Sequence, residues 1–298
     1  MHIQAPVYTL GFVQSMLTEE SGRASGWFKD IEIRTVFQPA FSLPHKKAVG
    51  FEATLRGAGE DGSVVAPDAI FGPVDNFSET CLLDLLGTTV HVHNFAASHS
   101  AQGLLFLNLH PEVFLDCEHS AKFLAALFEH YHIPKHRVVL DIPAYLLKLE
   151  RLDEAIAAYR ALGCMISIDD LGLENADLDS VVRTGPDIVK IDHSVIASAV
   201  ANESVRQRLL HAVSLLHEMG TLVLLEGVES KAEALMAIEA DADFASGFYF
   251  GPLYDDVDKF DEPGGVLDNL WDSYKENRGR RKAHETESRD SLDEETVQ

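Results

Sequence analysis

Residues 165–192, MISIDDLGLENADLDSVVRTGPDIVKID, contain two short apolar runs that carry residues of the kind that bind metal or handle protons. The first run ends in Asp169 and Asp170, and the second ends in Lys190. A buried parallel strand reads as a continuous Val/Ile/Leu run, so a charge at its end needs an explanation. Both runs are therefore predicted strands with polar chemistry at their carboxyl ends.

Four other apolar runs end in, or enclose, a polar residue in the same way. They are VGFEATLR, LLFLN, VVLD and LVLLE, which carry Glu52, Asn108, Asp141 and Glu226. Catalytic residues of a β/α barrel lie at the carboxyl ends of its strands. Six such runs in series, separated by helix-length segments, therefore predict the mouth of a β/α barrel.

Helical and strand-like patterns alternate over more than 150 residues. Helices are predicted at 78–98, 119–131, 150–162, 175–184, 203–219 and 231–240, and strands at 104–109, 137–142, 165–171, 188–192, 221–228 and 244–250. This alternation is typical of parallel strands joined by crossover helices. An open doubly wound sheet alternates too, but its ligand-binding residues gather at one switch point. Because polar residues end nearly every strand, we favour the barrel within the α/β class.

The composition divides the chain into three parts. Residues 1–31 hold one weakly amphipathic segment and the polar stretch SGRASG, and they predict an N-terminal helix and a linker. Residues 32–254 form the barrel domain, which opens with two runs, IEIRTVFQPAF and AVGFEATLR, that look like an antiparallel pair. Residues 255–298 predict a last helix at LDNLWDSY and then a charged, disordered tail. We expect the segments on both sides of the barrel domain to be exposed to solvent, and the alternative is that they bind a protein partner.

Acidic residues outnumber basic ones by 48 to 24, which gives a formal net charge of −24. This balance argues against binding of a nucleic acid polymer, which would need clustered Lys and Arg. It permits a small anionic ligand, because a divalent cation can supply positive charge locally. The three cysteines form no CxxC pair, and no signal peptide or membrane-spanning run is evident. We therefore expect a soluble, cytoplasmic protein that does not bind a membrane.

The side chains at the predicted strand ends are mostly oxygen donors. Glu52, Asn108, Asp141 and Asp169 offer the ligands that Mg²⁺ or Mn²⁺ prefers. Asp170 directly follows Asp169 and is placed to reach a second cation. Two divalent ions can clamp the attacking and leaving oxygens of a phosphodiester during in-line displacement.

Two further residues suit the same reaction. Lys190 could stabilise charge or orient the attacking water, and Glu226 could accept its proton. In contrast, His91 and His93 are two apart on a predicted helix and do not share a face. We expect these histidines to be exposed to solvent and not to form a zinc site.

The motifs also carry a family resemblance. FQP, GFEATLR, LNLHP, DIP, IDDLG, PDIVKID, LEGVES and SGFYFGP follow one another in this order. The order resembles the EAL-domain family of cyclic di-GMP phosphodiesterases over residues 32–254. PDIVKID and EGVE, at their spacing from the aspartate pair, are specific enough that chance is a poor explanation. The resemblance implies a modified TIM-type (β/α)8 barrel whose first strand runs antiparallel.

The resemblance also implies an activity, namely the opening of cyclic di-GMP to linear pGpG with Mg²⁺ or Mn²⁺. On this template Glu52 is the glutamate of the signature triplet. The other implied roles are those of the remaining metal ligands Asn108, Asp141, Asp169 and Asp170, of Lys190 on the nucleophilic water, of Glu226 as an acid or base, of Glu229 as its support, and of Gln38 and Arg56 as contacts to the dinucleotide. The resemblance further implies a homodimer formed through the loop and helix after Lys190.

This chain departs from the family pattern at several positions. Thr54 replaces the leucine of the signature triplet, which leaves the metal ligand intact. Asp141 replaces a glutamate, so its carboxylate is drawn back by roughly 1.5 Å, about one C–C bond. Ala144 replaces a second glutamate, Glu174 replaces a glycine in the loop after the aspartate pair, and Ser246 replaces a glutamine. Loss of such supporting groups commonly costs about 10–100-fold in metal affinity or activity.

These matches and departures leave two functions open. The first is a slow, metal-dependent cyclic di-GMP phosphodiesterase. The second is a catalytically inactive EAL domain that acts as a cyclic di-GMP receptor or a protein-interaction module. A metalloenzyme for a different phosphodiester is a third interpretation, against which Gln38, Arg56 and PDIVKID weigh.

Overall fold

The computed structural model describes residues 8–65, 67–99, 102–149, 151–173, 178–262 and 265–276. Its strands are β1 (Leu17–Glu20), β2 (Arg23–Phe28), β3 (Ile31–Ser42), β4 (Lys47–Gly59), β5 (Val64–Val65), β6 (Leu104–Asn108), β7 (Val138–Pro143), β8 (Met165–Leu171), β9 (Ile188–Ile191), β10 (Leu222–Leu225) and β11 (Phe244–Ser246). Its helices are α1 (Leu10–Gln14), α2 (Pro67–Ile70), α3 (Phe77–Ala97), α4 (Pro111–Leu115), α5 (Cys117–His130), α6 (Leu152–Leu162), α7 (Leu178–Thr184), α8 (His193–Ala201), α9 (Glu203–Glu218) and α10 (Lys231–Glu239).

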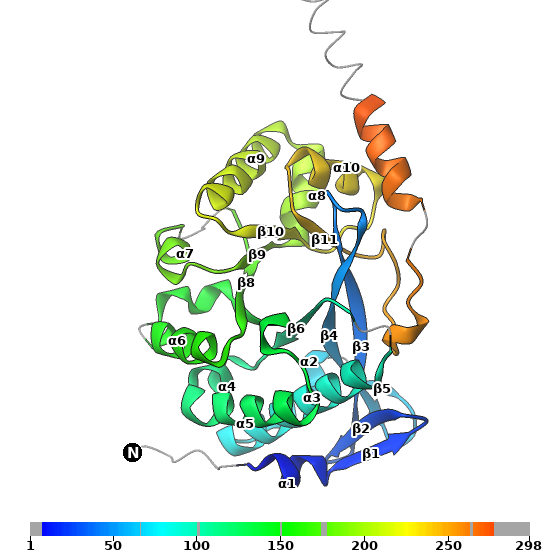
Figure 1. The fold of residues 1–298 in the computed structure, drawn as a ribbon, viewed down its shortest axis with the longest axis vertical. Coiled ribbons are helices and arrows are strands. Elements are labelled where there is room, and N and C mark those ends of the chain that lie inside the picture. The colour runs from blue at the N-terminus through cyan, green and yellow to red at the C-terminus, as the bar shows by residue number, and fades with distance from the viewer. Residues whose placement is uncertain are drawn as a thin grey trace, which may run out of the picture.

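Eight of the described strands close into a barrel, and helices pack around it (Figure 1). The strands β4, β6, β7, β8, β9, β10 and β11 are neighbours in this order, and each pair is parallel. The strand β3 closes the ring between β11 and β4 and is antiparallel to both. The prediction of an α/β barrel of modified TIM type with an antiparallel first strand is therefore confirmed.

The strand β3 meets three different partners along one edge. It pairs with β2 at its start and with β11 at its end. Between them, Phe37 exchanges two backbone hydrogen bonds with Tyr254, at 2.6 and 2.9 Å. Because an unpaired strand edge invites association with other chains, this covering protects the seam of the barrel.

A small apolar cluster fills the inside of the barrel. It consists of Ala40, Phe106, Val139, Ile188 and Leu224. Side chains alternate between the two faces of a strand, so the residue two positions later points the same way. Two positions after the last four of these residues stand Asn108, Asp141, Lys190 and Glu226. The barrel interior thus changes from apolar to polar toward the carboxyl ends of its strands.

Helices pack against the outside of the barrel through apolar side chains. In α9 the buried residues Leu209, Ala212, Val213 and Leu216 recur at intervals of three and four, as expected for an amphipathic helix. Side chains cap the first turns of α3, α8, α9 and α10, and α10 has a complete capping box. Among the described residues, no helix combines the length and the apolar character that crossing a membrane requires.

The N-terminal region differs from its prediction. The helix α1 has five residues, and the stretch predicted as a linker forms the antiparallel hairpin of β1 and β2, which adds to β3. Asn94 of α3 fixes this hairpin, since it exchanges hydrogen bonds of 2.7 and 2.9 Å with the backbone of Ala24. Gly26 lies against Leu86, where a Cβ would come within 2.7 Å of the leucine. The linker prediction was wrong because packing against α3, rather than β-propensity, makes the RASG part of this stretch the start of β2.

The segment after the barrel folds back onto it. A helix over residues 266–276 confirms the prediction made from LDNLWDSY. Trp271 of this helix donates a hydrogen bond of 2.8 Å to the carbonyl of Leu43, in the turn between β3 and β4. Residues 277–298 of the predicted disordered tail lie outside the described residues.

The expectation of an exposed His91 was also wrong. His91 is 2% exposed, His93 is half-buried, and the Nδ1 atom of His91 lies 2.6 Å from the hydroxyl of Thr35. Burial lowers the pKa of His91 to about 3, so its imidazole is neutral in the folded protein. The sequence pattern does not reveal this burial, because α3 packs against the barrel and also against the N-terminal hairpin.

We predict that His91 makes the protein less stable as the pH falls. Between pH 6.5 and about 3 the unfolded chain binds a proton at this imidazole and the folded chain does not. The free energy of unfolding then loses up to about 1.4 kcal/mol per pH unit from this group. Asp84, whose pKa is raised to about 7, acts in the opposite direction over an overlapping range.

Thermal denaturation from pH 7.5 to 5, with wild type and the variants His91→Asn and His136→Asn, isolates the effect. His91→Asn should show less loss of stability with falling pH than wild type. The exposed His136 serves as the control, and its variant should follow wild type. Equal slopes in wild type and His91→Asn would contradict the prediction.

Candidate active site

Four carboxylates converge on one ammonium group at the carboxyl ends of the barrel strands. The Nζ atom of Lys190 lies 3.0 Å from Glu52 Oε2, 2.9 Å from Asp141 Oδ2 and 2.9 Å from Glu226 Oε1. It also lies 3.7 Å from Asp169 Oδ1. These five residues come from β4, β7, β8, β9 and the end of β10, so the barrel itself assembles the cluster.

The barrel interior determines where the lysine goes. Lys190 follows Ile188 by two positions on β9 and therefore points inward, and its side chain has no solvent exposure. Its Nζ atom lies 5.6 Å from the centroid of the Phe106 ring, which belongs to the apolar cluster below. The ammonium thus has an aromatic face on one side and carboxylates on the other.

Burial and charge set the protonation of this cluster. Burial opposes the charge on Lys190, but attraction by Asp141, Glu226 and Glu52 outweighs it and raises the pKa of the ammonium well above its usual value. Burial raises the pKa values of Asp141 and Glu226 well above those of ordinary carboxyls. Burial also acts on Glu52, but Lys190 and a hydrogen bond of 2.9 Å from Asn108 lower the pKa of this group. Glu52 is therefore the most firmly ionised of the three.

Asp141 provides a test of whether the residues fit a divalent cation. Both of its carboxylate oxygens are buried, and neither has a hydrogen-bond partner among the described residues. The Lys190 ammonium is close to one of them, but outside hydrogen-bonding geometry. Buried carboxylate oxygens without partners are costly unless something binds them. This donor set fits a hard cation such as Mg²⁺ or Mn²⁺.

A second group of oxygen donors lies beside the first. One carboxylate oxygen from each of Asp169, Asp170 and Glu226 lies within 4.8 Å of the others. The backbone of Asp170 is left-handed, with φ of 56°, and the pairing of β8 with β9 shifts register between Ile168 and Leu171. This irregularity turns Asp170 out of the strand pattern, so that consecutive aspartates both reach the site. Burial and the neighbouring Asp169 raise the pKa of Asp170.

Close backbone packing holds the segment that carries Glu226. Gly227 has φ of +65°, and a Cβ there would lie 2.6 Å from Cβ of His193. The backbone N–H of Val228 donates to Ser246 at 2.9 Å, which ties this segment to β11. Glu229 donates its backbone N–H to Glu233 at 2.7 Å, and its side chain is exposed. Among the described residues, no hydrogen bond or ion pair joins the Glu229 side chain to the cluster.

Gln38 and Arg56 lie on the long ribbon of β3 and β4. Gln38 is directly opposite Glu52, and Arg56 is four positions further along β4. Residues i, i+2 and i+4 of a strand share a face, so Glu52, Gln38 and Arg56 face the same side. Arg56 lines a cavity of about 550 Å³, and its guanidinium donates to the carbonyl of Leu55 at 2.7 Å.

One anchor near the site was not predicted from the sequence. Asp84 of α3 is buried and accepts a hydrogen bond of 2.8 Å from the backbone N–H of His110. His110 caps α4 and stacks on Phe71, with 5.4 Å between ring centroids. This anchor fixes the turn directly after Asn108. An isolated aspartate inside a helical pattern was the only signal, and it reads as an exposed residue.

We predict that Lys190→Met destabilises the protein strongly in the absence of divalent cations. Removal of a buried ammonium leaves its carboxylate partners uncompensated, which costs about 3–5 kcal/mol in comparable cases. Thermal denaturation with a chelator and with CaCl₂ measures the effect, because a bound cation would restore part of the lost stability. Lys46→Met, which breaks an exposed pair with Asp268, should change the stability by less than about 1 kcal/mol. A Lys190→Met variant as stable as wild type in the chelator would contradict the prediction.

Comparison with known proteins places this site in a family. Residues 23–252 match the family model of the EAL domain. The EAL-domain containing protein YkuI of Bacillus subtilis is 28% identical over 230 residues, which are 73% of this chain and 54% of YkuI. The cyclic di-GMP phosphodiesterase RocR of Pseudomonas aeruginosa is 23% identical over 232 residues, 74% of this chain and 57% of RocR. This chain thus spans little more than half the length of either relative.

Solved structures share the fold. YkuI of Bacillus subtilis, in complex with cyclic di-GMP and calcium, has a TM-score of 0.71 at 22% identity, covering 84% of this chain and 62% of that chain. The FimX EAL domain from Pseudomonas aeruginosa, bound to cyclic di-GMP, has a TM-score of 0.69 at 20% identity, covering 76% and 93%. The manganese and cyclic di-GMP complex of Klebsiella pneumoniae BlrP1 has a TM-score of 0.69 at 17% identity, covering 81% and 61%. The match over most of its length and the common barrel show that this chain belongs to the EAL domain family.

Proposed function

We propose that this protein is a phosphodiesterase that opens cyclic di-GMP to linear pGpG with Mg²⁺ or Mn²⁺. The observation that carries the proposal is the buried cluster of Glu52, Asp141, Asp169 and Glu226 around Lys190. Such a concentration of carboxylates costs free energy to bury and has no structural purpose that apolar residues would not serve better. A binding site for divalent cations accounts for it.

The relatives support the substrate. RocR is a cyclic di-GMP phosphodiesterase, and PdeN of Escherichia coli, 27% identical over 237 residues, is a probable one. EAL structures with the same barrel contain cyclic di-GMP together with calcium or manganese. The extension of both properties to this chain is part of the proposal.

The residues divide between cation binding and proton transfer. Glu52, Asn108, Asp141 and Asp169 would hold one divalent cation, and Asp170 would contribute to a second. When bound, the cations stabilise negative charge on the phosphodiester and lower the pKa of the attacking water.

Lys190 and Glu226 act on the water that attacks phosphorus. The ammonium of Lys190 would orient this water and balance the negative charge of the carboxylates. As the new P–O bond forms and the bond to the leaving ribose oxygen breaks, Glu226 would take the water's proton. Burial raises the pKa of Glu226, which makes its carboxylate a stronger base than an exposed glutamate.

Gln38 and Arg56 would position the dinucleotide along the ribbon. Four residues of an extended strand span about 13 Å, which separates Arg56 from Glu52. A substrate with its scissile phosphate at Glu52 can therefore reach the guanidinium of Arg56 with its distal half. Arginine suits this position because its planar group matches phosphate oxygens and guanine edges.

The second candidate is a receptor that binds cyclic di-GMP without cleaving it, or a protein-interaction module. The full burial of Asp141 favours it, since this carboxylate is already within 2.9 Å of Lys190. A side chain one methylene shorter than glutamate is less able to complete the octahedral geometry that Mg²⁺ demands. Ala144 also brings no carboxylate to the loop that carries Asp170.

We predict that wild type converts cyclic di-GMP to pGpG in Mn²⁺ and that Glu52→Ala lowers the rate about 100-fold or more. Product chromatography measures the rate, and calorimetry with Ca²⁺ measures binding without turnover. Glu118→Ala, which changes an exposed carboxylate on α5, is the control and should leave the rate unchanged. Tight binding without product would establish the receptor instead, and full activity in Glu52→Ala would place the reaction elsewhere.

We further predict that Asp141→Glu strengthens Mn²⁺ binding or raises the rate by about tenfold. The added methylene restores the reach of the glutamate that the family pattern has at this position. Cation titrations and steady-state kinetics check the two effects separately. Asp153→Glu on the outer helix α6 is the matched control. Unchanged affinity and rate in Asp141→Glu would indicate that Ala144 and the loop after β8, and not Asp141, limit cation binding and turnover.

A further inference from the structure

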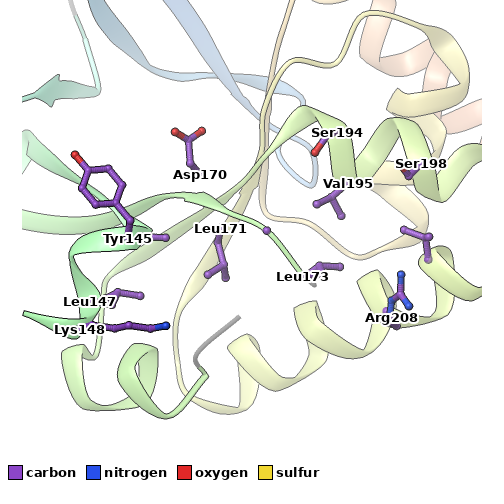
Figure 2. Close-up of a pocket in the computed structure, with 13 residues that line it drawn as sticks. Tyr145, Leu147, Lys148, Asp170, Leu171, Leu173, Ser194, Val195, Ser198 and Arg208 are labelled. Atoms are coloured by element: carbon purple, nitrogen blue, oxygen red, sulfur yellow. The ribbon is translucent and has the colours of Figure 1, made fainter. Parts of the chain in front are cut away.

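A second pocket adjoins the carboxylate cluster on the side away from the β3–β4 ribbon. It has a volume of about 510 Å³, within the range of small-molecule sites. Figure 2 shows it between the 3₁₀ turn Ala144–Lys148, the segment after β8, and the helices α8 and α9. Asp170 lines its edge, so the pocket and the proposed cation site share one side chain.

Two basic residues line this pocket. Figure 2 shows Lys148 on one side and Arg208 on the other, both exposed. Among the described residues, neither has a carboxylate within 4 Å, whereas Arg206, two positions before Arg208, pairs with both Glu203 and Glu239. In a chain with 48 acidic and 24 basic residues, two cationic side chains on opposite sides of one pocket favour an anionic ligand.

The remaining lining is apolar and aromatic. Leu147, Leu171 and Val195 give the pocket an apolar wall, and Leu173 and Val205 extend it. Tyr145 is 70% exposed beside Asp170, which is unusual for a side chain of its size. Tyr145 and Lys148 belong to the same 3₁₀ turn, and an aromatic ring combined with a cationic groove is an arrangement on which proteins stack nucleobases while binding phosphate.

The pocket has a local cause in the sequence. Position 144 carries a methyl group, and Gly172 carries no side chain, so neither fills the space between the turn and the segment after β8. The left-handed backbone of Asp170 directs the chain around this space. A ligand placed there would contact the same segment that presents Asp170 to the cations.

We propose that this pocket binds a 5′-phosphorylated nucleoside, with its phosphate at Lys148 or Arg208 and its base against Tyr145 and the apolar wall. This chemistry occurs in free mononucleotides and at the 5′ end of linear pGpG, the second source resting on the proposed function. Because the pocket shares Asp170 with the cation site, ligand and cation alter each other's affinity by the same factor.

Calorimetry on the full chain in CaCl₂ tests the proposal with three probes: 5′-GMP, linear pGpG and inorganic phosphate. We expect wild type to bind 5′-GMP, and the double variant Lys148→Ala, Arg208→Ala to bind it at least about tenfold more weakly, as for the loss of a charge-assisted hydrogen bond. Tyr145→Ala should weaken 5′-GMP but leave phosphate unchanged. Lys122→Ala, an exposed lysine on α5, is the control and should bind like wild type. Tighter binding of pGpG than of 5′-GMP would identify the reaction product as the ligand, and the reverse would identify a mononucleotide.

The outcomes separate this proposal from the proposed function. Binding of 5′-GMP that survives in Glu52→Ala and weakens in the double variant supports the pocket, whether or not cyclic di-GMP is cleaved. Binding that disappears in Glu52→Ala and persists in the double variant would place the nucleotide in the barrel mouth and overturn the proposal. Equal affinity for phosphate and 5′-GMP, or no binding at millimolar concentration, would overturn it as well.

Discussion

One buried positive charge holds the functional end of this barrel together. Without the ammonium of Lys190, the carboxylates of Glu52, Asp141, Asp169 and Glu226 would repel one another in a region of low dielectric. The lysine reaches them because β9 points it inward above the apolar cluster that contains Phe106. Burial raises the pKa values of Asp141 and Glu226, so these two groups hold a negative charge less firmly than Glu52 does. The cluster is therefore stable enough to fold and still acidic enough to bind cations.

The sequence predicted the barrel and its polar mouth because both follow from short-range patterns. Apolar runs mark the strands, and the two-residue period of a strand places Asn108, Asp141, Lys190 and Glu226 inside the same ring. The pattern of two adjacent strand-like runs predicted an antiparallel pair, and the family resemblance placed the antiparallel strand first in the barrel. Arrangement around the ring, which brings Glu52 and Glu226 within reach of one lysine, depends on closure between β3 and β11. Closure is a long-range property that no window of sequence contains.

What the sequence did not predict depends on tertiary packing. SGRASG has weak strand propensity, and its last four residues begin β2 because they pack against Asn94 and Leu86 of α3. His91 and Asp84 look like surface residues of an amphipathic helix, but α3 is covered on both sides, and both side chains are buried. The pocket beside Asp170 is open because Ala144 has only a methyl group and Gly172 has no side chain. Two small residues that are far apart in the sequence do not predict a pocket. The motifs therefore predicted which residues form the site, whereas the contacts that support those residues are visible only in the structure.

The seam where β3 meets β11 has a consequence for how the chain acquires its fold. β3 and β4 form a hairpin of neighbouring residues, whereas β11 must return to β3 across about two hundred residues of intervening chain. Local pairing forms readily, and distant pairing carries a larger loop-closure cost. Until β11 docks, the nascent barrel would expose two open strand edges, one on β3 and one on β10. The chain would therefore pass through an aggregation-prone intermediate until β11 and the Tyr254 bridge cover the edge of β3.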